Sequence, residues 1–205
     1  MTNDARLMAP ATARNREPIT KVLRRHLPSR GLALEVASGS GEHVTHFATV
    51  LSADLRFQPS DPDMGARASI DAWVQSAGVS NVLPAIALDA SADPWPIQWA
   101  DAVICINMIH IAPWEAAIGL VRGAARLLPA NGLLYLYGPY RRYGQHTAAS
   151  NEAFDGSLRR QNQRWGVRDL EAVAELAEEH GFARPLIDEM PANNLSLIFQ
   201  RVARA

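Results

Sequence analysis

Apolar runs and amphipathic stretches alternate five times along this chain, and that alternation constrains the fold more than any other feature. The apolar runs predict strands over 32–36, 55–58, 82–88, 102–108 and 133–137. The periodic stretches predict helices over 18–27, with Pro18 in its first turn, and over 42–51, 63–77, 113–128 and 168–180. Such alternation is typical of a parallel sheet that helices cover on both faces.

Two further strands are expected at the C-terminal end, over 182–190 and 195–201, joined by a hairpin at 191–194. The hairpin would place one antiparallel strand in an otherwise parallel sheet. The sequence therefore predicts an α/β fold with a mostly parallel, seven-stranded sheet and helices on both faces. We expect residues 1–205 to form a single domain, a length that suits one core. Segment 1–30 is expected to act as a lid, and the polar stretch 138–166, with a short helix near 151–160, as a substrate-side insertion.

Composition excludes several classes of protein. Cys105 is the only cysteine and lies in an apolar run, so we expect a buried thiol and neither a disulfide framework nor a multi-cysteine zinc site. His43 and His46 are three residues apart, but no third ligand has matching spacing, and we expect no metal. The net charge of −1 lacks the basic surplus of nucleic-acid binders. Without a long apolar segment or signal core, we expect a cytoplasmic monomer or homodimer that binds a small molecule and no membrane.

A glycine-rich turn at 37–41 leaves the first strand and opens a helix, where Gly39 and Gly41 allow backbone amides to approach a ligand. The fingerprint of a nicotinamide-dinucleotide site would need a third glycine at position 44, which is Val44. Glu35 precedes the turn, and a carboxylate there suits a cationic ligand group and would repel a diphosphate. The turn therefore favours a ligand that carries an amino group.

Two acidic residues follow at the ends of the next strands. Asp61 comes twenty residues after Gly41 and could accept hydrogen bonds from both hydroxyls of a ribose. Asp89 ends the third expected strand and could reach an adenine amino group. The alternatives are that Asp61 caps the helix beginning near 63, and that Asp89 is a turn residue.

The pattern of Glu35, the two glycines, Asp61, Asp89 and the strand end at 107–110 resembles class I S-adenosylmethionine-dependent methyltransferases. One departure is Ala37, which stands where that class has its first glycine. More closely, the chain resembles the methyltransferase-like family catalogued as a domain of unknown function. The segments that carry this resemblance are 13–19, 57–61, 107–113, 136–140 and 150–155.

The resemblance implies a Rossmann-like class I methyltransferase fold and S-adenosylmethionine as cofactor. Gly39 and Gly41 would wrap the methionine part, Glu35 would orient the turn or bind near the amino group, and Asn107 would hold the methionine end, unless it only satisfies loop backbone groups. The expected cofactor-binding residues are Asn15, Glu35, Ala37, Ser38, Gly39, Gly41, Asp61, Asp89, Ala90, Asn107 and Met108.

Acceptor chemistry is expected at the carboxyl ends of the strands, near 14–17, 107–113 and 138–146. His110 is the leading candidate for a general base, because histidine titrates near neutral pH, with Tyr140 and His146 as weaker candidates. The alternative for His110 is a hydrogen bond within its own loop. Substrate contacts are expected from Arg14, Tyr140, Arg141 and Tyr143. Arginines also crowd 141–168, and one or two of them, Arg141 and Arg142 first, could clamp an anionic substrate.

The sequence thus predicts an enzyme that methylates oxygen or nitrogen of a small molecule. A second hypothesis is a regulatory or scaffold protein that binds S-adenosylmethionine without turnover. A substrate pocket filled by the chain's own 138–166 segment would favour that hypothesis. A nicotinamide-dependent reductase is disfavoured by Val44, by the C-terminal hairpin and by the absence of a tyrosine–lysine pair, since Lys21 is the only lysine.

Overall fold

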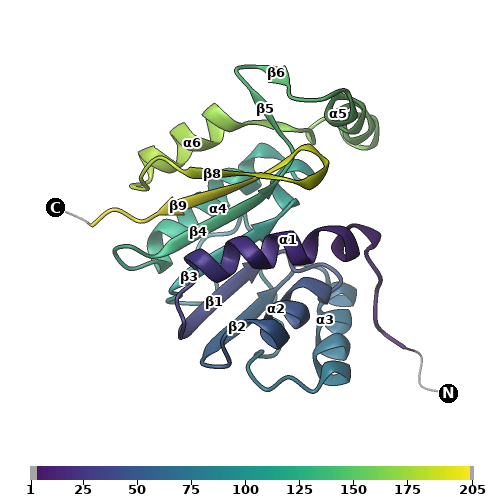
Figure 1. Ribbon diagram of the computed structural model, residues 1–205, viewed down its shortest axis with the longest axis vertical. Helices are drawn as coiled ribbons and strands as arrows, with labels where there is room; N and C mark the ends of the chain where they lie inside the picture. Colours follow the sequence, from purple (N-terminus) through teal and green to yellow (C-terminus); the bar gives the residue numbers. More distant parts are fainter. Residues whose placement is uncertain (1–3, 204–205) are drawn as a thin grey trace.

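The computed structural model describes residues 4–203, and its main sheet has the strand order β2-β1-β3-β4-β9-β8 (Figure 1). The first four of these strands run parallel to one another, while β9 is antiparallel to both of its neighbours. The fold class and the antiparallel C-terminal hairpin strand are therefore confirmed. The bounds are Gly31–Val36 for β1, Leu55–Ser60 for β2, Ala102–Ile106 for β3, Leu133–Gly138 for β4, Leu186–Met190 for β8 and Asn194–Gln200 for β9.

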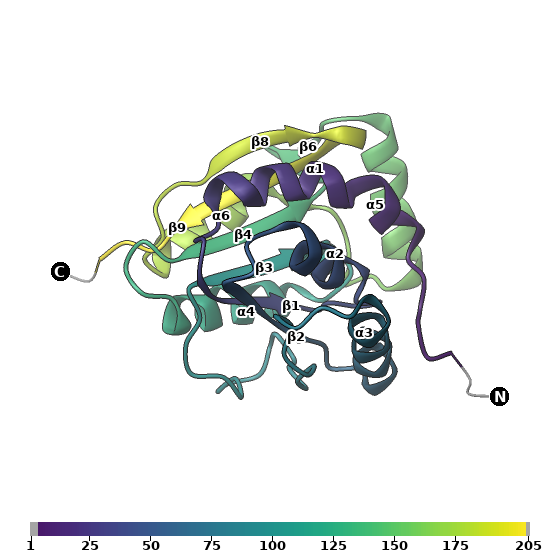
Figure 2. The ribbon, with the colours of Figure 1, turned by 60° about the horizontal axis from the view of Figure 1, so that its bottom comes forward.

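Helices cover both faces of this sheet. Figure 2 shows α1 on one side of β3 and β4 and α4 on the other. The helices are α1 (Pro10–His26), α2 (Glu42–Val50), α3 (Met64–Ala77), α4 (Trp114–Leu127), α5 (Ala149–Gln161) and α6 (Leu170–Glu179). Among the described residues, no helix has the length and the apolar character that a membrane crossing would require.

The side chains of each central strand alternate between two apolar cores. In β3, Val103 and Cys105 pack with residues of α4 and α6, whereas Ala102 and Ile104 pack with residues of α1 and α2. Strands that are apolar throughout suit this double burial. Cys105 is the buried thiol that was expected, and burial raises its pKa to about 12.

The expected strand over 82–88 is the one strand that the structure corrects, so the main sheet has six strands and not seven. The segment runs beside β2 but makes only two isolated bridges with it, at Val82 and Ile86. Pro84 in the segment and Pro59 in β2 have no N–H to donate, so a continuous hydrogen-bonded ladder cannot form. The segment still brings Asp89 to the carboxyl ends of the strands.

Helix α1 is longer than the pattern over 18–27 predicts. It begins at Pro10, and Pro18 lies inside it and not in its first turn. A proline there removes one helical hydrogen bond, but Ile19 and Leu23 are fully buried against the sheet and hold the helix in place. The extra turns put Arg14 and Asn15 on a helix.

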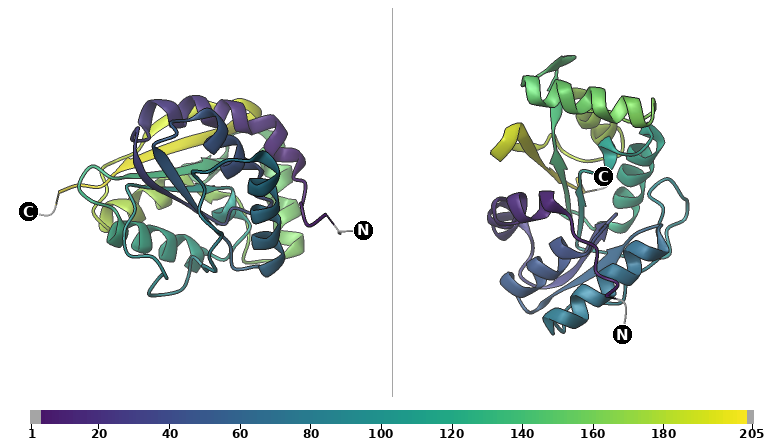
Figure 3. Two further views of the ribbon diagram at one scale, coloured as in Figure 1. Left: turned by 90° about the horizontal axis from the view of Figure 1, so that it is seen from below. Right: turned by 90° about the vertical axis from the view of Figure 1, so that its right-hand side faces the viewer.

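The chain before α1 lies across α3 and the start of α2 (Figure 3). The Leu7 amide donates to Ser69 Oγ at 2.7 Å, and the Ala9 amide donates to Glu42 Oε2 at 2.6 Å. Ser69 Oγ in turn donates to the carbonyl of Ser40, at 2.7 Å. The segment is thus tied to the outer side of the glycine-rich turn. Its action as a lid stays a prediction, and residues 1–3 of the expected lid lie outside the described residues.

The 138–166 stretch builds a small structure of its own beyond the carboxyl ends of the main strands. Strands β5 (Tyr140–Arg142), β6 (Gln145–His146) and β7 (Arg168–Asp169) form a second sheet in the order β6-β5-β7. The helix expected near 151–160 is α5. Figure 1 shows α5 and the first turns of α1 at the same edge of the molecule.

Candidate functional site

The glycine-rich turn has a backbone conformation that few residues adopt. Ala37, Gly39 and Gly41 all have positive φ angles, of 58°, 57° and 89°. A Cβ on Gly41 would lie 2.6 Å from the Cα of Ile70 in α3, so α3 leaves room there for glycine only. The Gly39 amide donates to Asp61 Oδ2 at 3.0 Å, which links the turn to the end of β2. The turn is therefore held by its neighbours as well as by its own residues.

A cavity of about 510 Å³, here named the Asp61 cavity, lies at the ends of β1, β2 and β3 beside the start of α4. Five of the expected cofactor residues line it, together with apolar side chains from several segments. The five are Ala37, Asp61, Asp89, Ala90 and Met108; Leu88, Ile111 and Arg164 are among lining residues that the sequence did not single out.

The two carboxylates of this cavity have distinct local roles. Asp61 is 8% exposed and is not the helix cap that the alternative proposed, because Asp63 caps α3 by accepting from the Ala66 amide at 2.7 Å. Asp89 does stabilise a turn, since its Oδ1 accepts from the Ser91 amide and hydroxyl. Both carboxylates nevertheless face the Asp61 cavity.

Glu35 is buried behind the turn and lines neither this cavity nor the larger one described below. Its Oε2 has no hydrogen-bond partner among the described residues. Burial raises the pKa of this carboxyl to about 7. Because Glu35 lines neither cavity, its position suits the expected role of orienting the turn better than direct contact with a ligand amino group.

Glu35→Gln is expected to change the pH dependence of stability. The folded-state pKa of about 7 exceeds the usual 4.5, so the unfolded state ionises first as the pH rises through that window. The wild type therefore loses stability between about pH 4.5 and 7, whereas glutamine does not titrate. The difference in melting temperature, variant minus wild type, should be several degrees larger at pH 8 than at pH 5. A difference that is the same at both pH values would refute this.

A second cavity, of about 560 Å³ and here named the Arg14 cavity, opens between α1, α5, the ends of β3 and β4, and the turn η2 (Pro191–Asn193). It contains Arg14, which was expected to contact the substrate, and also Asn15 and Asn107, which were expected to bind the cofactor but do not line the Asp61 cavity. Its other polar and aromatic residues were not predicted; they are Tyr137, Ser150, Asn151, Phe154 and Asn194. Of these, Tyr137 could have been suspected because it lies near the end of a strand.

Asn15 connects this cavity to the helix after the glycine-rich turn. Its Oδ1 lies 2.8 Å from His43 Nε2, and Asn15 lines the cavity together with Tyr137. Burial lowers the pKa of His43 to about 4, so this histidine is neutral near pH 7. A neutral, buried imidazole is suited to holding Asn15 in place.

The expected catalytic residues reach neither cavity. His110 and Tyr140 are both fully buried and pack edge to face with ring centroids 5.0 Å apart. Burial lowers the pKa of His110 to about 3 and raises the pKa of Tyr140 well above its usual value. His146 lies 3.4 Å from Asp155 Oδ2 and lines neither cavity. The loop-stabilising alternative therefore describes His110 better than a general base does.

Two of the expected substrate residues also lie elsewhere. Arg141 in β5 and Tyr143, which is 79% exposed, line neither cavity. Arg142 is ion-paired with Glu171 at 3.0 Å. The anion clamp expected from Arg141 and Arg142 is thus displaced from both cavities, because the small second sheet holds these residues away from them and Arg142 pairs with Glu171 of α6.

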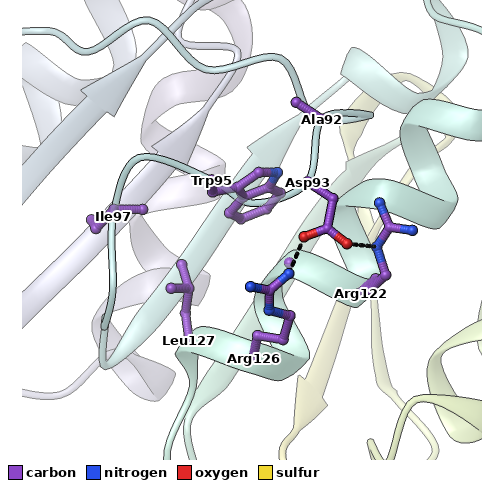
Figure 4. A pocket seen from close by; sticks show the side chains of 8 residues that line it. Ala92, Asp93, Trp95, Ile97, Arg122, Arg126 and Leu127 are labelled. Carbon is purple, nitrogen blue, oxygen red and sulfur yellow. Dashed lines mark hydrogen bonds and ion pairs between the residues drawn. The ribbon is translucent and has the colours of Figure 1, made fainter.

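A third hollow, between α4 and the segment before β3, has room for little more than a water molecule, about 30 Å³. Figure 4 shows that Asp93 forms ion pairs there with Arg126 and Arg122. Its charged groups are therefore already partnered, and it is not a candidate site.

Solved structures of methyltransferases have the same fold as this chain. An O-methyltransferase family protein from Burkholderia thailandensis superposes with a TM-score of 0.80 at 17% identity, over 95% of this chain and 58% of its own. Human N-acetylserotonin methyltransferase in complex with SAM gives 0.72 at 14% identity, over 95% and 53%. The chain thus spans little more than half the length of these two proteins. A putative sarcosine dimethylglycine methyltransferase from Galdieria sulphuraria gives 0.73 at 12% identity, over 98% and 94%.

At such low identities these likenesses establish the Rossmann-like class I methyltransferase fold and nothing finer. One protein family covers almost the whole chain: its model, described as "Protein of unknown function (DUF938)", matches residues 6–201. The chain belongs to the DUF938 family and has the fold of class I S-adenosylmethionine-dependent methyltransferases.

Proposed function

We propose that this protein is an S-adenosylmethionine-dependent methyltransferase that acts on a small molecule. One observation carries the proposal: both cavities reach the carboxyl end of β3, where Met108 lines the Asp61 cavity and the preceding residue, Asn107, lines the Arg14 cavity. A cofactor in the first cavity and an acceptor in the second would therefore both reach this strand end. The two volumes are of the size that small-molecule sites commonly have.

The residues of the Asp61 cavity suit the cofactor. Asp61 would accept hydrogen bonds from the ribose hydroxyls, and Asp89 with Ala90 would contact the adenine edge. When bound, S-adenosylmethionine supplies an activated methyl group for an in-line displacement.

The chain's own contribution would be to orient the acceptor and to exclude water. The lining of the Arg14 cavity, all within the described residues, includes no carboxylate and no histidine. Partial burial raises the pKa of Tyr137, so its hydroxyl keeps its proton near neutral pH. The proposal therefore favours an acceptor that needs no strong base, such as an amine that arrives unprotonated or an acidic hydroxyl.

The second hypothesis was a binding protein without turnover, which a filled substrate pocket would have favoured. Pro139, Ser150, Asn151 and Phe154 of the 138–166 stretch line one wall of the Arg14 cavity and leave its volume open. An open cavity next to a cofactor site supports an enzyme over a purely regulatory or scaffold role.

The first test is thermal stability with S-adenosylhomocysteine, with NAD as the control. A ligand at 100 times its dissociation constant adds about 2.7 kcal/mol to the stability of the folded state. For a chain of this size the midpoint should rise by roughly 5–10 °C. A rise with S-adenosylhomocysteine alone is expected. No rise, or a rise with NAD instead, would overturn the proposal and the roles given to Asp61 and the turn.

A further inference from the structure

The charges in the Arg14 cavity are one-sided. Arg14 is the only charged residue among those that line it. In the described part of the chain, Arg14 takes part in none of the ion pairs, unlike Arg142 and Arg159, which are paired with acidic neighbours. A guanidinium without a protein partner at the wall of a cavity is suited to binding an anion, and a planar carboxylate best of all.

Tyr137 adds a second donor next to it. The Oδ1 of Asn15 can only accept, so His43 Nε2 carries the proton in their 2.8 Å contact. The amide nitrogen of Asn15 then remains as a donor. Tyr137 lines the same cavity as Arg14, and its raised pKa keeps its hydroxyl protonated near neutral pH. Tyr137 therefore offers the cavity a neutral donor beside the charged one of Arg14.

Asn151 and Asn194, which also line the cavity, offer it hydrogen-bond acceptors where Arg14 offers donors. The amide nitrogen of Asn151 donates to Thr147 Oγ1 and to the carbonyl of Asn193, and that of Asn194 donates to two carbonyls of η2. Their donors are thus engaged within the protein, and their side-chain oxygens remain as acceptors. Such oxygens suit an N–H or O–H group of a ligand.

The remaining wall is apolar and includes one aromatic ring. Phe154, which is 42% exposed, lines the cavity together with Pro139 and Pro191. Flat rings pack well against such surfaces. The lining therefore combines one cation, an apolar and aromatic surface, and hydrogen-bond acceptors.

We propose that the acceptor is a compact aromatic monocarboxylate that carries an amino or hydroxyl group. Arg14 and Tyr137 hold its carboxylate, Phe154 contacts its ring, and the side-chain oxygens of Asn151 and Asn194 accept from its N–H or O–H. This inference rests on the proposed function and names the substrate class for the same site. It also assigns Tyr137, Asn151 and Phe154 as residues that determine specificity.

The test measures binding of three probes, benzoate, 4-hydroxybenzoate and 4-aminobenzoate, each beside its matching carboxamide, to protein saturated with S-adenosylhomocysteine. At least one carboxylate should bind about tenfold or more tightly than its amide, since hydrogen bonds to charged groups contribute about 1.5–3 kcal/mol. Arg14→Gln should remove that preference and leave amide binding unchanged. Lys21→Gln removes the same charge from an exposed position of α1 and should change neither.

The outcomes separate this inference from the proposed function. No binding of any carboxylate, or equal binding of acids and amides, would overturn the inference while the stabilisation by S-adenosylhomocysteine still supported a methyltransferase. Arg14→Gln could also weaken S-adenosylhomocysteine as strongly as the carboxylates. That result would assign Arg14 to the methionine carboxylate of the cofactor and would equally overturn the inference. A wild type that S-adenosylhomocysteine does not stabilise would defeat the proposed function itself.

Discussion

Asp61→Asn is expected to weaken the binding of S-adenosylhomocysteine by about 100-fold, which corresponds to loss of about 3 kcal/mol from two charge-assisted hydrogen bonds to ribose hydroxyls. The carboxylate is almost fully buried, lines the Asp61 cavity, and accepts the Gly39 amide at 3.0 Å and the Asp63 amide at 3.0 Å. An asparagine keeps the shape but offers one carbonyl oxygen in place of two charged ones. Isothermal titration calorimetry at constant pH measures the effect.

Asp63→Asn is the matched control for this prediction. Asp63 is two residues away and caps α3 through its bond from the Ala66 amide, a role that asparagine fills about equally well. It does not line the Asp61 cavity, so its substitution should leave affinity within about twofold, inside the ±0.5 kcal/mol expected of a neutral site. If both variants lose affinity equally, Asp61 acts through the structure of the loop and not through the ribose.

Much of the Asp61 cavity and the turn beside it could be predicted from the sequence because they depend on local patterns. Glu35, the glycine-rich turn and Asp61 sit at fixed short distances from strand ends, and the register of β1 against β2 brings them together. The positive φ angles of the turn are set within one strand–turn–helix unit. The hydrogen bond from Gly39 to Asp61 needs only the next strand of the chain.

The strand over 82–88 shows a limit of pattern reasoning. Its composition is that of a buried strand, but whether it can pair depends on the partner it meets. The partner strand β2 carries Pro59, and the segment itself carries Pro84, so neither can donate where the ladder needs it. The proline inside this apolar run was the available sign that the segment would not form a regular strand, and its effect outweighed the β-propensity of the run.

His110 was misjudged for a different physical reason. Its position after a strand end made it look accessible, but its burial is decided by segments far away in the chain. A Cβ on Gly138 would lie 2.3 Å from His110 Nε2, and Gly166 and Arg168 both donate backbone bonds to His110. Because the chain returns across the loop only at 166–168, no local pattern could reveal that the imidazole is enclosed.

The acceptor half of the site likewise depends on distant segments. The Arg14 cavity is walled by the start of α1, by α5 and by η2, and α1 lies more than a hundred residues from the other two in sequence. The sequence pointed to Arg14 as a substrate contact and to Asn15 and Asn107 as cofactor contacts, and all three line this cavity. The residues of α5 and η2 carry no sequence signal for ligand binding, since their position follows from packing alone, whereas Tyr137 offered one by its place near a strand end.

Gly41→Ala is the second prediction with a large expected effect. The φ angle of 89° costs an alanine about 1–2 kcal/mol, and a Cβ 2.6 Å from the Ile70 Cα adds about 1–3 kcal/mol of overpacking, because a backbone atom cannot rotate away. The melting temperature should therefore fall by roughly 10 °C. Since α3 must move away from the turn, stabilisation by S-adenosylhomocysteine should be lost as well. Differential scanning fluorimetry with and without the ligand measures both effects.

Gly39→Ala provides the matched comparison two residues earlier. Gly39 also has a positive φ, of 57°, but an added Cβ would meet nothing within 4 Å in the protein. Only the conformational cost of about 1–2 kcal/mol applies there, so the melting temperature should fall by roughly half as much or less. Equal destabilisation by the two substitutions would show that backbone conformation alone limits the turn. A clearly larger effect at Gly41 would show that its close contact with α3 sets the shape of the turn, and with it the position of the Gly39 amide beside Asp61.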